Sequence, residues 1–212
     1  QWKRLMTDAL LGGEDAMAFQ EPGPIDVLIT VLATRTLAAP FYRAYVDSLG
    51  LQGNERVLDY GSGAGAEARF LARKLQAGGG RLTCVDISAV WIEVAREALR
   101  KYPHVECKQG EIAALDIPDG AYDAAVVHFV LHDIPAESRP AIVAQLARKL
   151  RPGGKLFVRE PMQRGGGIAG DGIAATEIRR LMAESGLREA SAAITHARLA
   201  GVMFAGVYCK EG

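Results

Sequence analysis

Three glycines at alternating positions follow an acid in the first third of the chain, and this stretch has the clearest chemistry. An apolar run ends at Asp59, and Gly61, Gly63 and Gly65 come next, before a helix-like segment at 66–75. Glycine has no Cβ atom, so such a turn can adopt positive φ and a ligand can approach its main chain closely. The amides at the start of the following helix then face the ligand, which favours a nucleotide-like molecule.

The spacing of these glycines separates several classes of nucleotide site. A dinucleotide-binding fingerprint requires Gly-x-Gly-x-x-Gly, whereas here the third glycine comes one residue early. A P-loop requires Gly-Lys-Ser/Thr, and no such sequence follows. The pattern Asp-x-Gly-x-Gly-x-Gly resembles the first motif of class I S-adenosylmethionine-dependent methyltransferases. This resemblance implies S-adenosylmethionine as cofactor, S-adenosylhomocysteine as product, and a cofactor-binding loop of Asp59, Tyr60, Gly61, Ser62, Gly63 and Gly65.

A second acid, Asp86, follows the next apolar run at 81–85. In an open parallel sheet, an acid at the carboxyl end of the strand beside the glycine loop can accept hydrogen bonds from both hydroxyls of a ribose. Asp86 could instead be a turn residue at a strand end, but its distance from the glycine loop is close to that of one βαβ unit and favours cofactor contact. Ile87 would then lie against the adenine, and Ser88 is the expected N-cap of the next helix.

The resemblance also implies which residues contact the adenine ring and its amino group. After their third strand, members of this family usually place an acid that receives the adenine amino group, and the next backbone amide touches the ring. Glu111 and Ile112 occupy these positions, after the strand-like run at 105–108. The family more often has aspartate, so this chain departs from the pattern in the length of its acidic side chain.

Titratable side chains follow the fourth strand-like run, at 122–127. Because the carboxyl ends of the strands open onto the ligand crevice, catalytic groups are expected there. His128 could line the methionine end of the cofactor or act as a base, although it could also be structural. His132 and Asp133 belong to the next turn and are further candidate bases. The family often reads Leu-His-His here, so His132 matches that pattern and Asp133 departs from it.

The fifth strand-like run, at 155–158, ends in Arg159 and Glu160. These two residues could pair with each other or face substrate, and Glu160 is a further candidate base. A helix expected at 39–49 carries Tyr42, which could face the ligand or pack against the sheet. We therefore assign Tyr42 and Arg159 as candidate substrate-binding residues.

The resemblance extends from Arg56 to Glu160 and includes the turn Leu150-Arg151-Pro152-Gly153-Gly154. Alternating strand-like and helix-like segments predict an α/β, doubly wound, seven-stranded and mostly parallel sheet. The resemblance implies a Rossmann-like order 3-2-1-4-5-7-6 with an antiparallel final hairpin. We expect one methyltransferase domain over 1–212, with a helical N-terminal cap at 1–50, a cofactor-binding core at 54–160 and a C-terminal helix and hairpin at 173–212. A glycine-rich segment at 163–172 is expected as a flexible connection or a lid.

The amino-acid composition limits the classes of partner that this protein is expected to bind. Of the 212 residues, 25 are Lys or Arg and 25 are Asp or Glu, so no global basic field favours nucleic acid. No apolar run reaches membrane-spanning length. The three cysteines, Cys84, Cys107 and Cys209, lie far apart in strand-like runs, which favours buried thiols and a cytoplasmic location. No metal site is expected, and oligomerisation stays open.

The expected function is methyl transfer from S-adenosylmethionine to a nucleophile of a small molecule. The region after the fourth strand has neither the Asn/Asp-Pro-Pro-Tyr/Phe motif of amino-methyltransferases acting on adenine or glutamine nor the Pro-Cys of cytosine-C5 enzymes. A protein, lipid or RNA acceptor is the enzymatic alternative. A non-catalytic module that binds S-adenosylmethionine is the second alternative, and a nicotinamide dehydrogenase, disfavoured by the glycine spacing, is the third.

Overall fold

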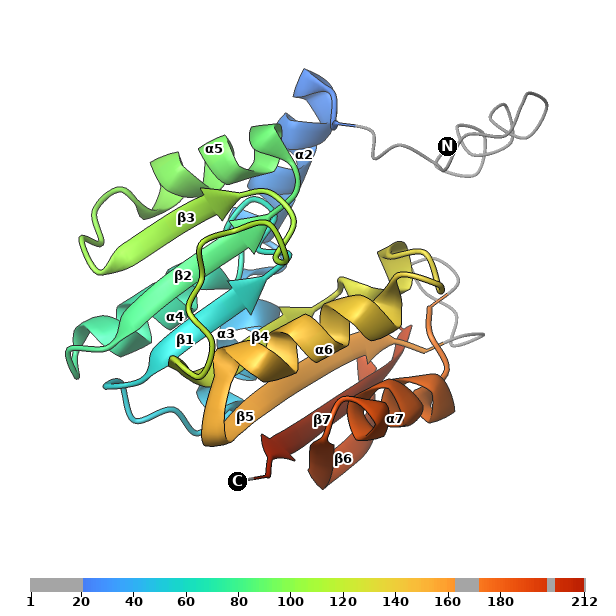
Figure 1. Cartoon of the computed structure of the whole chain (residues 1–212). Coiled ribbons are helices and arrows are strands. Elements are labelled where there is room, and N and C mark those ends of the chain that lie inside the picture. Colours follow the sequence, from blue (N-terminus) through green and yellow to red (C-terminus); the bar gives the residue numbers. More distant parts are fainter. Residues whose placement is uncertain (1–20, 163–171, 198–200, 212) are drawn as a thin grey trace.

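The computed structural model describes residues 21–162, 172–197 and 201–211. Most strands alternate with helices along the chain (Figure 1). The elements in chain order are α2 (Pro24–Arg35), α3 (Ala39–Ser48), β1 (Arg56–Tyr60), α4 (Ala68–Gln76), β2 (Arg81–Asp86), α5 (Ala89–Leu99), β3 (Val105–Gln109), β4 (Tyr122–His128), η1 (Leu131–Asp133), α6 (Arg139–Lys149), β5 (Leu150–Pro161), α7 (Ala175–Glu184), β6 (Leu187–Ala197) and β7 (Gly201–Lys210). The first part of the predicted cap, 1–20, and most of the glycine-rich segment, 163–171, lie outside the described residues.

Seven strands form one sheet in the order β3-β2-β1-β4-β5-β7-β6. This confirms the predicted order. The strands β1 to β5 pair in parallel, and β7 runs antiparallel to both β5 and β6. The carboxyl ends of β1, β2, β3 and β4 therefore lie at one edge of the sheet, where an open α/β fold binds its ligand.

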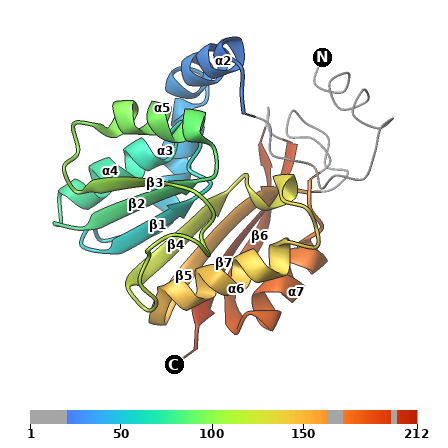
Figure 2. The same ribbon diagram turned by 45° about the horizontal axis from the view of Figure 1, so that its top comes forward.

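Helices cover both faces of the sheet (Figures 1 and 2). The helices α3, α4 and α5 pack on one face, and the buried cluster there includes Val46, Leu71, Leu99, Val57 and Val126. The helices α6 and α7 pack on the other face, in a cluster that includes Leu146, Leu181, Leu58 and Val127. Each such side chain contributes about 1.5–3 kcal/mol when it leaves water.

Alternation along the strands decides which layer each polar side chain faces. Asp59 and His128 stand two residues after Val57 and Val126, which pack under the α3–α5 layer. Arg159 faces the same layer, because its guanidinium contacts rings of α3. Glu160, one residue later, faces the opposite layer and contacts the η1 segment.

One local prediction needs correction. The fifth strand begins at Leu150, earlier than the predicted start at 155, because the Pro-Gly-Gly turn forms an irregularity within the strand, where Gly153 has a φ of 73° and the register with β4 shifts.

From residue 21 onward, the cap segment forms the helices α2 and α3, and α2 has no buried residue. Its exposed apolar side chains are Ile25, Leu28, Ile29 and Leu32, and α2 projects beyond the sheet in both views (Figures 1 and 2). Among the described helices, none alone is long and apolar enough to cross a membrane. The helices α2 and α3 meet both criteria only when they are taken together, and this pair is bent by 61°.

Candidate functional site

The glycine loop closes tightly against β2 on one side and is open on the other. Gly61 and Ser62 donate backbone hydrogen bonds to the Val85 carbonyl at 2.8 and 3.0 Å, and Gly61 has a φ of 72°. A Cβ atom on Gly61 would lie 2.4 Å from Cγ2 of Val130, whereas one on Gly63 would meet no described atom within 4 Å. The backbone at Gly63 is therefore the part of the loop that a ligand can approach.

Asp86, at the end of β2, is oriented by the same loop. Its Oδ2 accepts the Gly63 N–H at 2.7 Å, and its Oδ1 accepts the Ser88 N–H at 2.9 Å. Each oxygen keeps a further lone pair, so the carboxylate can still accept ribose hydroxyls. Burial raises the pKa of Asp86 above its ordinary value. The next residue, Ile87, is 37% exposed, and the predicted cap is confirmed because Ser88 Oγ accepts the Trp91 N–H at 2.9 Å.

Glu21, which the sequence interpretation missed, contacts the start of α5. Its carboxylate accepts hydrogen bonds from Ser88 Oγ and from the Ala89 N–H, the second at 2.7 Å. The hydrogen bond from Ser88 and those from the backbone lower the pKa of Glu21. An acid is stabilised at a helix N-terminus by the unpaired amides and the helix dipole. No periodic pattern surrounds Glu21, so the sequence offers no signal for this contact.

The residues predicted for the adenine end differ in exposure. Ile112 is 2% exposed, whereas Glu111 lies at the surface. Asp86 and Glu111 both influence the hydroxyl of Tyr60. Burial, followed by the negative charges of these two acids, raises the pKa of Tyr60 to about 12. A backbone hydrogen bond also joins the ends of β2 and β3, since the Gly110 N–H donates to the Asp86 carbonyl at 2.9 Å. The predicted ribose and adenine residues therefore lie close together.

Two buried acids and a histidine lie beneath the glycine loop. Asp59 is 2% exposed, and Glu67, which precedes α4, is 5% exposed. Glu67 Oε2 lies 2.5 Å from Nδ1 of His128. Burial raises the pKa of Glu67 to about 8 and lowers that of His128 to about 3. Burial, reinforced by Glu67 and Asp86, also raises the pKa of Asp59 well above its ordinary value.

The sequence interpretation missed Glu67, although a signal was present. Glu67, Leu71 and Leu75 follow one another at a spacing of four, so the glutamate continues the apolar stripe of α4 that packs on the sheet. A charged residue in such a stripe is expected to be buried, and a buried acid requires a partner or a function.

The donors of this crevice fit S-adenosylmethionine, the cofactor that the glycine motif implies. Two carboxyl oxygens, Asp59 Oδ2 and Glu67 Oε1, are buried and have no hydrogen-bond partner among the described residues. Unsatisfied buried carboxyl groups suit a ligand that brings hydrogen-bond donors, and Asp86 suits ribose hydroxyls. No group of three His, Cys, Asp or Glu side chains within the described ranges is arranged to hold a metal ion.

A second glutamate–histidine pair lies on the opposite face of the sheet. Glu160 is 0% exposed; its Oε1 accepts the N–H of Val130 and of Leu131 at 2.9 and 2.8 Å. Its Oε2 lies 2.7 Å from Nδ1 of His132. Burial opposes a positive charge on His132. The hydrogen bond to Glu160 and the negative charge of that glutamate outweigh burial, so the pKa of His132 is raised. Asp133 is the third group here, with its Oδ1 3.4 Å from His132 Nε2.

Aromatic rings surround His128 at the end of β4. The ring centroids of Tyr45 and Phe129 both lie 4.5 Å from that of His128, and those of Tyr42 and Phe41 lie at 5.4 and 5.8 Å. Phe129 has a φ of 62°, the one positive φ among the described non-glycine residues. Such backbone strain is costly for a bulky residue and is concentrated at functional sites. Tyr42, a predicted substrate residue, therefore belongs to the wall beside His128.

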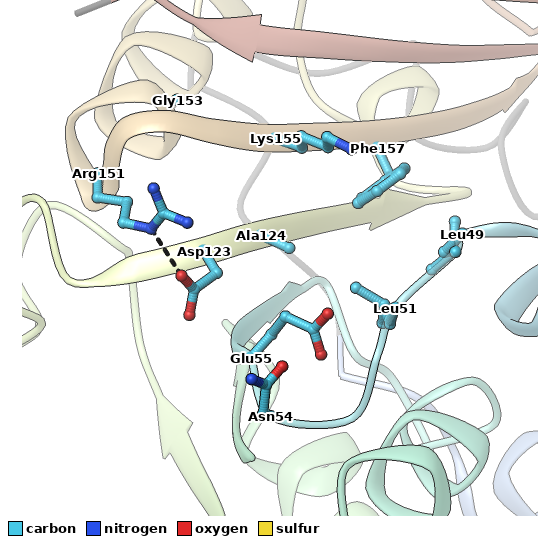
Figure 3. A pocket seen from close by; sticks show the side chains of 11 residues that line it. Leu49, Leu51, Asn54, Glu55, Asp123, Ala124, Arg151, Gly153, Lys155 and Phe157 are labelled. Atoms are coloured by element: carbon cyan, nitrogen blue, oxygen red, sulfur yellow. Dashed lines mark hydrogen bonds and ion pairs between the residues drawn. The ribbon is translucent and has the colours of Figure 1, made fainter. Parts of the chain in front are cut away.

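The cavity shown in Figure 3 lies at the opposite end of the strands. It has a volume of about 280 Å³ and is lined by the segment between α3 and β1 and by residues of β4 and β5. Its Arg151 and Asp123 side chains pair with each other at 2.6 Å. None of the predicted site residues lines it, so we separate it from the candidate active site.

Comparison with known proteins agrees with this geometry. A family profile described as a methyltransferase domain matches residues 57–154. The demethylmenaquinone methyltransferase of Tropheryma whipplei is 32% identical over 122 residues, which are 58% of this chain and 48% of that protein. The carboxy-S-adenosyl-L-methionine synthase of Pseudomonas fluorescens is 30% identical over 139 residues, 59% of this chain and 56% of that protein. The chain thus spans about half the length of these curated relatives.

The fold is also found among solved structures. A crystal structure of a SAM-dependent methyltransferase from Methanosarcina mazei superposes with a TM-score of 0.66 at 20% identity, covering 78% of this chain and 97% of that one. The matched profile contains the glycine loop, Asp86 and β4, the same elements that assemble the crevice. Profile, relatives and strand order agree: residues 57–154 match a methyltransferase domain, and the chain is similar in sequence and fold to class I S-adenosylmethionine-dependent methyltransferases.

Proposed function

We propose that this protein transfers the methyl group of S-adenosylmethionine to a nucleophile of a small molecule. The observation that carries the proposal is the meeting of the open backbone at Gly63, the oriented Asp86 and the aromatic wall around His128 at one edge of the sheet. When bound, S-adenosylmethionine supplies a methyl group made electrophilic by its sulfonium. The remaining task of the protein is to orient the acceptor and exclude water.

The roles of the cofactor residues follow from their places. Asp59 and the loop through Tyr60, Gly61, Ser62, Gly63 and Gly65 would hold the methionine part, with His128 at its far end. Asp86 would accept the ribose hydroxyls, because Gly63 and Ser88 already fix its two oxygens. Ile87 would cover one face of the adenine, and Glu111 and Ile112 would meet its edge.

A base is needed only if the acceptor must lose a proton. His128 is our first choice, since burial keeps its imidazole neutral and its Nε2 has no partner among the described residues. His132 is the second choice, with Glu160 and Asp133 as the acids that orient it. Tyr42 and Arg159, in the wall beside His128, would contact the acceptor.

Two observations favour a small acceptor. The curated relatives include methyltransferases named for quinone biosynthesis, and Lys and Arg are balanced by Asp and Glu, so no overall positive charge attracts nucleic acid. We propose a cytoplasmic location, since the three cysteines are free. A protein, lipid or RNA acceptor, or binding without turnover, would be the alternative.

A transfer assay with radiolabelled methyl donor tests the proposal. The purified protein would be incubated with a panel of phenols, amines, thiols and carbon acids, and in parallel with protein, lipid and RNA fractions. We expect label in one small-molecule class, lost in Asp86→Ala and retained in Asp116→Ala, an exposed acid after β3. Label in a macromolecular fraction alone would reverse the choice of acceptor. Donor binding without transfer to any fraction would favour the non-catalytic module.

A further inference from the structure

Arg159 lies near the carboxyl end of β5, beside His128. The two residues are register partners on the neighbouring strands β5 and β4. The Arg159 guanidinium carbon lies 4.1 Å from the ring centroid of Phe41 and 4.9 Å from that of Tyr45. These rings hold the guanidinium plane in place and leave less freedom to be lost when it binds a ligand.

The charge of Arg159 has no ion-pair partner among the described residues. Arg139, another arginine largely removed from solvent, contacts Glu177 at 2.6 Å. Glu160 follows Arg159 in sequence, but it faces the other side of the sheet and bonds to His132. The alternative that Arg159 pairs with Glu160 is therefore not what the geometry shows.

Glu67 is the remaining acid in the neighbourhood. It interacts with the charge of Arg159, but burial raises its pKa to about 8, and its Oε2 already contacts His128. At neutral pH this glutamate is largely protonated and leaves the guanidinium charge uncompensated. A partly desolvated cation without a counter-ion is a site for an anion.

The surroundings of Arg159 indicate what else the anion carries. Phe41, Tyr42 and Phe129 are only partly buried, and their rings lie beside His128. Aromatic walls favour an apolar or planar body, and their low polarity strengthens the attraction between a guanidinium and an anion. A carboxylate matches the planar fork of arginine through two parallel hydrogen bonds.

We propose that the methyl acceptor is an organic carboxylate with an apolar or aromatic body, and that Arg159 binds its carboxylate group. This inference rests on the proposed function, because it places the acceptor beside the cofactor crevice. It adds the charge and the chemical class of the substrate, which the family leaves open.

Binding of matched probes to the protein saturated with S-adenosylhomocysteine tests this. Each aromatic carboxylate, beginning with benzoate and indole-3-carboxylate, is compared with its primary amide by ligand-observed NMR, which detects millimolar binding. Phenyl phosphate distinguishes a phosphate site from a carboxylate site. The variants are Arg159→Gln and Lys155→Gln; Lys155 stands on the same strand and the same face, at the opposite end, and loses the same charge.

We expect the carboxylates to bind about tenfold or more tightly than the amides, as a charge-assisted pair implies. The preference should vanish in Arg159→Gln and persist in Lys155→Gln, with S-adenosylhomocysteine affinity kept in both variants. Equal binding of amides and carboxylates, tighter binding of phenyl phosphate than of benzoate, persistence of the preference in Arg159→Gln, or no probe binding would overturn the inference. Failure of the wild type to bind S-adenosylhomocysteine would instead refute the proposed function.

Discussion

Two glutamate–histidine pairs within the described residues have the same chemical groups and different surroundings. Glu67 meets His128 at 2.5 Å and Glu160 meets His132 at 2.7 Å, in each case through Nδ1. Yet the pKa of His128 is lowered to about 3, whereas that of His132 is raised. The distance within a pair therefore does not decide which partner carries the proton.

The difference lies in the other donors around each carboxyl group. Glu160 accepts N–H groups of the β4–η1 turn in addition to the imidazole, so its negative charge is compensated by the backbone. Glu67 receives no backbone hydrogen bond among the described residues, and its Oε1 has no partner. Burial without donors favours the neutral forms of both Glu67 and His128. We infer that the Glu160 pair holds the turn in place, while Glu67 Oε1 and His128 Nε2 are available to form hydrogen bonds with a ligand.

Replacing Glu160 should have the largest effect on stability. Glu160→Ala leaves two turn amides and His132 without their buried acceptor, and breaking a buried charged pair costs about 3–5 kcal/mol. Urea unfolding would measure the loss of unfolding free energy. Glu184→Ala, on the exposed side of α7, is the control with an expected change of about 0.5 kcal/mol or less. A cost for Glu160→Ala no greater than that of the control would remove the structural role of this pair.

The two histidines should titrate far apart. His128, with a pKa of about 3, should stay neutral throughout mild acid, whereas His132 should gain its proton above the ordinary histidine value of 6.5. NMR of ¹⁵N-labelled imidazoles from pH 4 to 9, assigned with His128→Gln and His132→Gln, would separate the two. Similar titration curves for both would show that the backbone donors around Glu160 do not create the difference.

Stability should depend on pH through Glu67. Its folded pKa of about 8 exceeds the ordinary glutamate value of 4.5, so between these values the folded state binds more protons than the unfolded state and stability falls as pH rises. The slope reaches at most about 1.4 kcal/mol per pH unit for one proton. Glu67→Gln should remove this slope in unfolding experiments from pH 5 to 8.5, while Glu97→Gln, an exposed substitution, should keep it. An unchanged slope in Glu67→Gln would contradict the assigned protonation.

The smallest expected effect concerns Asp133. Its carboxylate lies 3.4 Å from His132 Nε2 and its side chain is 77% exposed, so water screens the interaction. Asp133→Asn should lower the pKa of His132 by a few tenths of a unit, since an exposed pair contributes about 0.2–1 kcal/mol. The same NMR titration measures this decrease in the pKa of His132. A decrease of more than about one unit would mean that Asp133, rather than Glu160, is the main partner of His132.

Much of this arrangement could be predicted from sequence, because parallel strands bring their carboxyl ends together. The glycine loop, Asp86 and His128 are each identified by the strand that precedes them, and the structure places them at one edge. The hydrogen-bond and ion-pair partners of these residues could not be predicted, since they depend on the direction of each side chain. Alternation along β5 does, however, separate Arg159 from Glu160 onto opposite faces, and that pattern was open to sequence reasoning.

Glu67 shows where local reasoning stopped. Its place in the apolar stripe of α4 was a signal of burial that the sequence interpretation did not use, and only the fold brings β4 and His128 against that stripe. The exposed Glu111 shows the reverse case, in which a family position is matched while the geometry of the side chain depends on the loop around Gly110.

Calorimetric titration with S-adenosylhomocysteine tests the central claim most directly. The account predicts saturable binding to the wild type, no binding of NADH, and affinity weakened about tenfold or more in Asp86→Ala, which removes the acceptor for the ribose hydroxyls. Asp116→Ala should bind as the wild type does. A folded wild type that binds no S-adenosylhomocysteine, or an Asp86→Ala variant with unchanged affinity, would contradict the cofactor crevice described above.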